Sequence, residues 1–377
     1  MRPRPDRLQR LPEQYFTALL ARVSAAARDG GAPLVDLGRG NPEVGPPAHV
    51  VERLAEAARD RRAHGYAPFR GLPELKEAVA ARYRGVYGVD LDPEREVAVV
   101  PGTKTALVEL ALVLAEPGDA VLLPDPGYAD YPSAVALAGA RLVPLPLDPA
   151  AGWAPDFEAA PTRDVAAAYL NYPSNPCAAC APPGTFAAAV RYGLRTGAAI
   201  VHDLAYGDLV FDGRAPASFL AEPGAKDVGV ELFSMSKSYG MAGWRLGFVV
   251  GSAELVARVE LLQDHVRAGI FRPVQEAAVA ALTGPQESVE ERRAAYERRR
   301  DRVVEALGQG RSEGTFFCWV ELPRGLDAAT LLTAHRVAVA PGEGFGATGE
   351  GWVRLSLAVD DGTLEAGLER LAAALAP

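Results

Sequence analysis

Short apolar segments alternate with amphipathic helical segments along most of the chain, from about residue 48 onward. Nearly continuous apolar runs are typical of strands buried on both faces, and strands separated by helices favour a mostly parallel sheet. The pattern therefore predicts an α/β fold in which helices cover a mostly parallel central sheet. The segments expected to form its strands are 96–100, 120–124, 141–147, 166–170, 198–203, 230–236 and 246–251.

The two ends of the chain have a different pattern. The segment "EQYFTALLARVSAAARDGG" predicts an amphipathic helix ended by glycines, and "PLVDLGRGNPEVGPP" predicts a short strand followed by a loop. Beyond "QEAAVAAL", we expect a long charged helix, short strands, a helix near 328–335 and a terminal helix. We therefore predict a large domain over residues 43–275 and a smaller α+β domain built from residues 1–42 and 276–377.

Composition narrows the class of protein and its location. Hydrophobic residues make up 49% of the 377 residues and charged residues 23%, as in a globular domain, and the formal net charge of −9 argues against nucleic acid or an anionic membrane as a partner. The sequence shows neither a membrane-spanning run nor a signal peptide. Three cysteines do not make a disulfide framework, so we expect a cytoplasmic protein.

Cys177 and Cys180 form a C-x-x-C motif that raises the question of a metal. A zinc or redox site needs further ligands, and no second cysteine pair or histidine cluster accompanies this one. Two unpaired thiols in a loop are the ordinary explanation, and we expect no metal site.

Polar residues follow four of the predicted strands. Thr103, Asn175, Asp203 and the segment 234–237 each lie just beyond an apolar run. Ligands of parallel sheets bind at the carboxyl edge of the strands. We therefore expect these groups to line a single pocket.

The segment "SMSKSYGMAGWRLGF" places Lys237 among glycine, aromatic and aliphatic residues. A desolvated lysine has a lowered pKa, and its neutral amine is a nucleophile. In "PGTKTALVELALVL" a turn leads into an apolar helix whose first N–H groups would bind a phosphate. The residues expected around that phosphate are Gly102, Thr103, Lys104, Ser234, Ser236 and Arg245.

Three further residue types complete a cofactor site. Asp203 is a carboxylate that would keep a pyridine nitrogen protonated, Tyr206 and Asn175 would donate to a ring hydroxyl, and Tyr128 would stack on a flat ring. Each has an ordinary explanation alone, such as a helix cap or a strand-end turn. Together with a reactive lysine they predict pyridoxal 5′-phosphate bound to Lys237 as a Schiff base.

With these motifs in place, the chain is identified as a member of the fold-type I pyridoxal-phosphate enzymes, and it resembles the class I/II aminotransferases. The resemblance extends over nearly the whole chain, and the pattern S-x-S-K followed by G-x-R-x-G is its most specific part. The matching segments are "GRGNP", "YAPFRGLPELKEAVA", "PGTKTAL", "PDPGYADY", "NYPSNP", "HDLAYGDLVFDG", "SMSKSYGMAGWRLGF" and "VRLSLA".

The resemblance implies roles for particular residues. Lys237 would be the Schiff-base lysine, and Asp203 and Tyr206 would complete the catalytic set. Arg354 would bind the α-carboxylate of the substrate, with Gly40 and Asn175 nearby. Tyr66 resembles a tyrosine that reaches the phosphate in the neighbouring subunit, which implies a homodimer with shared active sites.

Two segments depart from the family pattern. The turn that usually reads N-P-T-G continues here with Cys177 and Ala178, and the loss of the glycine alters the expected loop geometry. The loop near Arg267 and Gly269 often faces the neighbouring active site, and these residue types are unusual there.

The resemblance implies transfer of an amino group between an L-amino acid and a 2-oxo acid. The segments "RRAHGYAPFRGLPELK" and "LLQDHVRAGIFRPVQEAA" resemble those of the family branch that forms methionine. Tyr15, Phe16 and Phe69 suit a substrate with a neutral or aromatic side chain, and a glutamate-type partner is expected for the second half of the reaction. Diaminopimelate or aspartate transamination, or a carbon–sulfur β-lyase on the same fold, are the alternatives. A distal carboxylate could be read by Arg39, Arg267 or Arg272.

Overall fold

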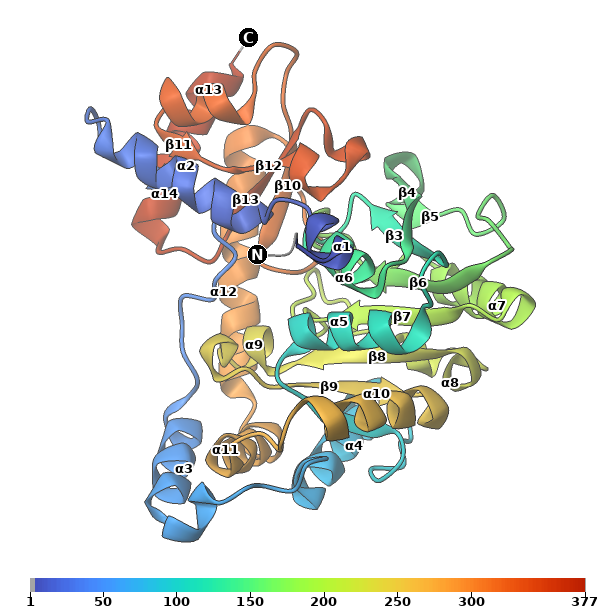
Figure 1. The fold of residues 1–377 in the computed structure, drawn as a ribbon. Helices are drawn as coiled ribbons and strands as arrows, with labels where there is room; N and C mark the ends of the chain where they lie inside the picture. Colours follow the sequence, from blue (N-terminus) through green and yellow to red (C-terminus); the bar gives the residue numbers. More distant parts are fainter. Residues whose placement is uncertain (1–3, 377) are drawn as a thin grey trace.

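An eight-stranded sheet forms the centre of the computed structural model, which describes residues 4–376 (Figure 1). Every segment predicted to be a strand of this sheet is one, and the sheet is mostly parallel as expected; the short edge strand β5 was not predicted. In spatial order the strands are β2 (Val97–Val100), β9 (Gly247–Gly251), β8 (Gly229–Ser234), β7 (Ala199–Leu204), β6 (Val165–Asn171), β3 (Ala120–Asp125), β4 (Arg141–Asp148) and β5 (Ala154–Pro155).

Strand direction decides which loops meet. β9 runs antiparallel to both β2 and β8, so β2 points the same way as the parallel strands β8, β7, β6, β3 and β4. The carboxyl ends of β2, β6, β7 and β8 therefore lie at one edge of the sheet.

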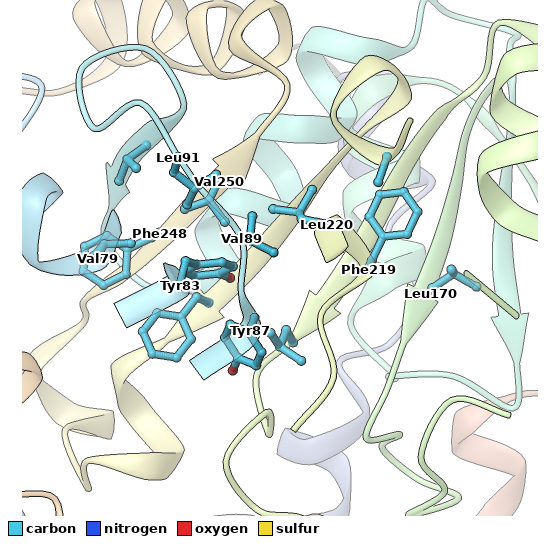
Figure 2. Packing of buried hydrophobic residues seen from close by; sticks show 14 of the residues in the cluster. Val79, Tyr83, Tyr87, Val89, Leu91, Leu170, Phe219, Leu220, Phe248 and Val250 are labelled. Atoms are coloured by element: carbon cyan, nitrogen blue, oxygen red, sulfur yellow. The ribbon is translucent and has the colours of Figure 1, made fainter. Parts of the chain in front are cut away.

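Helices cover both faces of the sheet with separate apolar cores. One face packs against α5 (Thr103–Leu114), α6 (Tyr131–Ala138) and α10 (Ala253–Val266). The other packs against α4 (Pro73–Tyr87), α7 (Thr185–Thr196) and α11 (Arg272–Thr283). Figure 2 shows the second core, where Val79, Tyr83 and Tyr87 of α4 lie against Phe248 and Val250 of β9. Burial on both faces explains why these strands read as unbroken apolar runs.

Segments from both ends of the chain lie together beside the large sheet (Figure 1). β1 (Val35–Asp36) pairs with β11 (Val337–Ala338), and the antiparallel strands β10 (Phe317–Glu321), β13 (Trp352–Ser356) and β12 (Ala340–Pro341) form a small sheet. The surrounding helices are α2 (Tyr15–Arg28), α13 (Ala328–Thr333) and α14 (Asp361–Leu375), and the remaining short ones are α1 (Asp6–Gln9), α8 (Ala225–Val228) and α9 (Met235–Ser238). The predicted boundary at 275/276 lies within α11, which packs against α3 (Ala48–Arg59) and α4.

The long helix α12 (Glu287–Leu307) binds the segment around Val44 and Gly45, which connects the two parts of the structure. The Arg292 guanidinium donates to the carbonyls of Val44 and Gly45, at 2.7 and 3.1 Å. The same connection packs against Gly240, where an added Cβ would lie 2.6 Å from the Val44 oxygen. Gly240 has φ +67°, so glycine suits both the space and the backbone. This contact sets the position of residues 38–45 relative to the segment that carries Lys237.

Among residues 4–376, no helix is both long enough and apolar enough to cross a lipid bilayer.

Candidate active site

A cavity of about 430 Å³ lies at the carboxyl edge of the large sheet, between the sheet and the segments from the two chain ends. Predicted site residues from four strand ends line it together, which confirms that they share one pocket. These are Gly40, Thr103, Lys104, Tyr128, Asn175, Asp203, Tyr206, Lys237 and Arg354. Lining residues that the sequence did not single out include Leu19, Leu20, Val23, Asp36, Asn171 and Phe317.

Lys237 lies on α9, the single helical turn that follows β8. The Ser234 hydroxyl caps this turn by accepting from the Ser236 N–H at 3.1 Å. The Lys237 ammonium donates to the Gly40 carbonyl at 3.3 Å, and the described residues offer it no carboxylate partner. Burial, reinforced by the nearby charges of Arg354 and Arg245, lowers the pKa of Lys237 to about 8. The amine is therefore available as a nucleophile or base near neutral pH.

Asp203 is held at the end of β7 by contacts that fix both carboxylate oxygens. Tyr131 donates its hydroxyl to Oδ2 at 2.9 Å, and the Ala205 N–H donates to Oδ1 at 3.2 Å. Burial raises the pKa of Asp203, while Tyr131, His202 and Lys237 counteract the rise. Sequence reasoning missed Tyr131, although it ends the motif "PDPGYADY" in which Tyr128 was chosen.

Arg354 provides a fixed anion site in the floor of the cavity. Its side chain, on β13, is about 1% exposed and donates to the Asn175 side-chain oxygen at 2.7 Å and the Gly38 carbonyl at 3.3 Å. The guanidinium lies 3.9 Å from the Phe317 ring centre, and its Nε has no partner in the described structure. Burial lowers the pKa of Arg354 to about 10. A buried guanidinium without a carboxylate is costly, so a bound carboxylate would complete this site.

The expected phosphate site lies at the first turn of α5. Gly102, with φ +84°, lies so close to the Arg245 guanidinium that an added Cβ would be 2.3 Å from it. The Thr103 N–H and side chain begin the helix and line the cavity. The Lys104 ammonium pairs instead with Asp130 at 2.8 Å, so its contribution to an anion would come from its backbone N–H. Ser234 and Ser236 are buried behind this turn rather than in the cavity lining.

The aromatic candidates separate into two groups. Tyr128 and Tyr206 line the cavity, the first in contact with Phe16 and the second against the Phe317 ring. Tyr66 is 90% exposed and does not line the cavity of its own chain. A role for Tyr66 therefore requires a second chain.

The turn that lacks the usual glycine keeps a left-handed residue there. Ala178 has φ +56°, and its N–H donates to the Ser174 carbonyl at 2.9 Å. A left-handed alanine costs on the order of 1 kcal/mol, which the buried turn offsets. Asn175 still reaches Arg354, so the departure does not displace this predicted contact.

These observations fit pyridoxal 5′-phosphate. A buried amine with a lowered pKa, a buried carboxylate, an aromatic side chain and the first residues of a helix surround one cavity. Lys237 would bond the cofactor aldehyde, Asp203 would face the ring nitrogen, and Gly102, Thr103 and Arg245 would face the phosphate.

The family model described as aminotransferase class I and II matches residues 32–371, and the chain belongs to this family, which uses pyridoxal 5′-phosphate. The chain is 43% identical over 376 residues to the L-glutamine–4-(methylsulfanyl)-2-oxobutanoate aminotransferase of Bacillus subtilis, which covers 97% of this chain and 94% of the relative. It is 37% identical over 377 residues to the LL-diaminopimelate aminotransferase of Moorella thermoacetica, covering 97% and 96%. Among solved structures, substrate-bound BacF from Bacillus subtilis is similar, with a TM-score of 0.93, 38% identity and coverage of 99% and 98%.

Proposed function

We propose that this pyridoxal-phosphate aminotransferase exchanges amino groups between L-amino acids with neutral side chains, methionine-like or aromatic, and 2-oxo acids, with a glutamate-type partner. The observation that carries the proposal is an apolar wall of the cavity that begins beside Arg354, whose guanidinium lies 5.4 Å from the Phe16 ring centre. Phe16, Leu19, Leu20 and Val23 of α2 face the cavity. Such a wall stabilises a thioether or aromatic side chain by burying apolar surface.

Four cationic side chains line the described cavity. Lys237 and Arg354 have predicted roles, and the other two are already paired with carboxylates. Arg39 is bound to Asp36 with 2.7 Å between Nε and Oδ2, and Lys104 is bound to Asp130. A substrate with a distal carboxylate would have to compete with these carboxylates. This arrangement favours uncharged side chains.

The two other arginines considered for a distal carboxylate do not line the cavity of their own chain. Arg267 donates to the Val99 carbonyl at 2.7 Å, and Arg272 pairs with Glu276 at 2.6 Å. Because both arginines already have partners, neither is available to bind a substrate carboxylate within this chain.

The residues of the chain divide the chemical work. Arg354 would hold the substrate α-carboxylate in a bidentate grip, which orients the Cα–H bond. Lys237, released when substrate binds, would remove the Cα proton because its pKa, lowered to about 8, leaves a substantial fraction of the amine neutral at that pH. The bound cofactor supplies an electron-withdrawing ring that stabilises the developing negative charge. Asp203 would keep the ring nitrogen protonated, an interaction that strengthens as that charge grows.

The relatives support the choice of substrate class. The name of the B. subtilis relative gives a carboxamide donor and a methylsulfanyl oxo acid, both without side-chain charge. The diaminopimelate relatives are less identical to this chain, at 37%, and remain the second candidate.

We also propose a homodimer. Apolar side chains that lie exposed near Tyr66 and on the segment around α11 need a cover, and Tyr66 would then reach a second chain. They include Phe69 at 48% exposed, Phe271 at 45% and Val266 at 65%. Sedimentation velocity should give twice the 39.8 kDa chain mass, and a monomer at micromolar concentration would contradict the proposal.

The test of the substrate is an amino-donor panel. Methionine, phenylalanine, glutamine, glutamate, aspartate, kynurenine and diaminopimelate would each be mixed with the loaded enzyme, and the absorbance change of the cofactor would give the rate of each half-reaction. We expect kcat/KM for methionine or phenylalanine to exceed that for aspartate by at least tenfold, the scale of about 1.4 kcal/mol. A preference for aspartate or diaminopimelate would overturn the proposal, and release of pyruvate and ammonia would indicate a β-lyase.

A further inference from the structure

A fully buried pair of ionisable side chains lies behind the cofactor aspartate. His202 on β7 and Glu231 on β8 are both 0% exposed, and they are register partners in the parallel sheet. Nδ1 of His202 lies 2.7 Å from Oε2 of Glu231. Because side chains alternate along a strand, His202 points to the face of the sheet opposite to Asp203.

Glu231 accepts hydrogen bonds at both of its carboxylate oxygens. Oε1 accepts from the hydroxyls of Tyr83 at 2.9 Å and Ser218 at 2.8 Å, and Oε2 accepts from the Phe219 N–H at 2.8 Å. Figure 2 shows Tyr83 and Phe219 on this side of the sheet. With those donors in place, Nδ1 of His202 also has to donate.

The other nitrogen of His202 faces the backbone of the neighbouring strand end. Nε2 lies 3.0 Å from the Tyr172 carbonyl, which can only accept, and 3.3 Å from the Tyr172 N–H. Nε2 therefore contacts both polar groups of the Tyr172 backbone, while Nδ1 contacts Glu231. The ring is enclosed by apolar side chains, with centroids 4.9 Å from Phe186 and 6.4 Å from Phe219.

Tyr172 begins the turn that carries a predicted site residue. Asn171 accepts from the Asn175 N–H at 2.7 Å and donates to the Asp203 carbonyl at 2.8 Å. Asn175 in turn holds Arg354. Hydrogen bonds therefore connect Glu231 through His202 to the Tyr172 backbone, and the adjacent residue Asn171 continues the connection to Asn175.

We infer that the His202–Glu231 pair is a positioning device, which locks the ends of β6, β7 and β8 together and so sets the placement of Asp203 and Asn175 in the active site. A buried ion pair is weak support for stability, because apolar replacements are often as stable. In this protein the pair instead holds the ends of β6, β7 and β8 in a fixed register, and the proposed active-site residues follow these ends. This inference rests on the roles proposed above for Asp203 and Asn175, but not on the choice of substrate side chain.

The pair also contributes charge. Burial raises the pKa of Asp203, and the positive charge of His202 is among the effects that oppose this rise. The titratable groups around the ring are Glu231 and Asp203, with Tyr83 beyond Glu231 and the Tyr172 hydroxyl turned away toward the Trp153 carbonyl. Replacing His202 removes this contribution and therefore favours the protonated form of Asp203.

The test uses the holoenzyme with His202→Gln and His202→Asn. Glutamine can restore the contact near Nε2, whereas asparagine can restore only the contact to Glu231. Tyr192→Phe is the matched control, since it removes a buried hydroxyl bond to the Pro161 carbonyl on the same face of the sheet, outside the cavity lining. The readouts are the melting temperature, the dissociation constant of pyridoxal phosphate and the pH at which the absorbance of the bound cofactor titrates.

Both His202 variants should move that titration upward by roughly half a pH unit or more. His202→Asn should also raise KM for the amino acid roughly tenfold while kcat changes less, because the loop with Asn175 loses its anchor. His202→Gln should retain KM, and Tyr192→Phe should lower only the melting temperature. Variants that lose stability but keep the wild-type titration and KM would show a purely structural pair and overturn the inference.

A measurement on the unmodified enzyme covers the case in which neither variant folds. Proton–nitrogen-15 spectra of histidine-labelled holoenzyme should show one imidazole whose Nδ1 proton is hydrogen-bonded and protected from exchange with solvent, as the contact of His202 with Glu231 requires. Absence of any such protected imidazole proton would overturn the contact on which the inference depends. Failure of the proposed substrate class would appear separately, in the amino-donor panel, with all these cofactor readouts unchanged.

Discussion

Asp36→Asn should shift substrate preference toward dicarboxylates, because it releases the one arginine that stands half-exposed at the cavity. Arg39 bonds Asp36 at 2.7 Å, with the two side chains 62% and 21% exposed. The asparagine oxygen can still accept from the Gly38 N–H, which Asp36 Oδ1 holds at 3.0 Å, so the local turn is retained. The substitution therefore changes charge with little change in shape.

The expected gain follows from the exposure of the pair. Solvent-exposed ion pairs contribute about 0.2–1 kcal/mol, so a substrate carboxylate that takes the place of Asp36 should gain about 1.4- to fivefold in binding. The assay is kcat/KM for glutamate and for methionine, measured side by side at low ionic strength. The ratio should move toward glutamate in the single variant and return in the double variant Asp36→Asn, Arg39→Gln. An unchanged ratio, or a gain that persists without Arg39, would refute the proposed competition.

Further predictions concern the groups that hold the cofactor. Lys237→Ala should abolish transamination and leave no cofactor that borohydride can fix to the protein; retained turnover would contradict the role of this amine. Asp203→Asn should lower kcat by about a thousandfold or more, roughly 4 kcal/mol, while pyridoxal phosphate still binds; an effect under tenfold would exclude the carboxylate as the partner of the ring nitrogen. Because the pKa of Lys237 is lowered to about 8, the amine gains its neutral form as pH rises through 8, so covalent capture of the cofactor by the apoprotein should accelerate from pH 6.5 and level off near pH 9. Stopped-flow absorbance would test this, and acceleration that continues beyond pH 10 would indicate an unperturbed lysine.

Much of the architecture could be predicted because the strands carry their own signal. Apolar runs buried on both faces mark β2, β3, β6, β7, β8 and β9 locally, and their direction then brings Thr103, Asp203 and Lys237 to one edge. These predictions needed no knowledge of side-chain contacts between distant segments.

Contacts between distant segments escaped prediction. Tyr131 reaches Asp203 across 72 positions, and Gln14 reaches Asp130 across 116, through packing of α6 and α2 that no local pattern encodes. The pairing of Lys104 with Asp130 likewise depends on where two loops meet. The sequence placed Lys104 near a phosphate, and only the folded arrangement shows that its ammonium pairs with a carboxylate.

Helix α2 separates two tasks that many enzymes combine on one scaffold. The groups proposed to handle the cofactor follow the strands of the central sheet, whereas the apolar surface proposed for a substrate side chain comes from a helix of fourteen residues near the start of the chain. Substitutions at Leu19, Leu20 and Val23 would therefore alter that surface while leaving the residues at the strand ends in place. Grafting this helix from a relative with a different preference is the shortest route to re-engineering the enzyme.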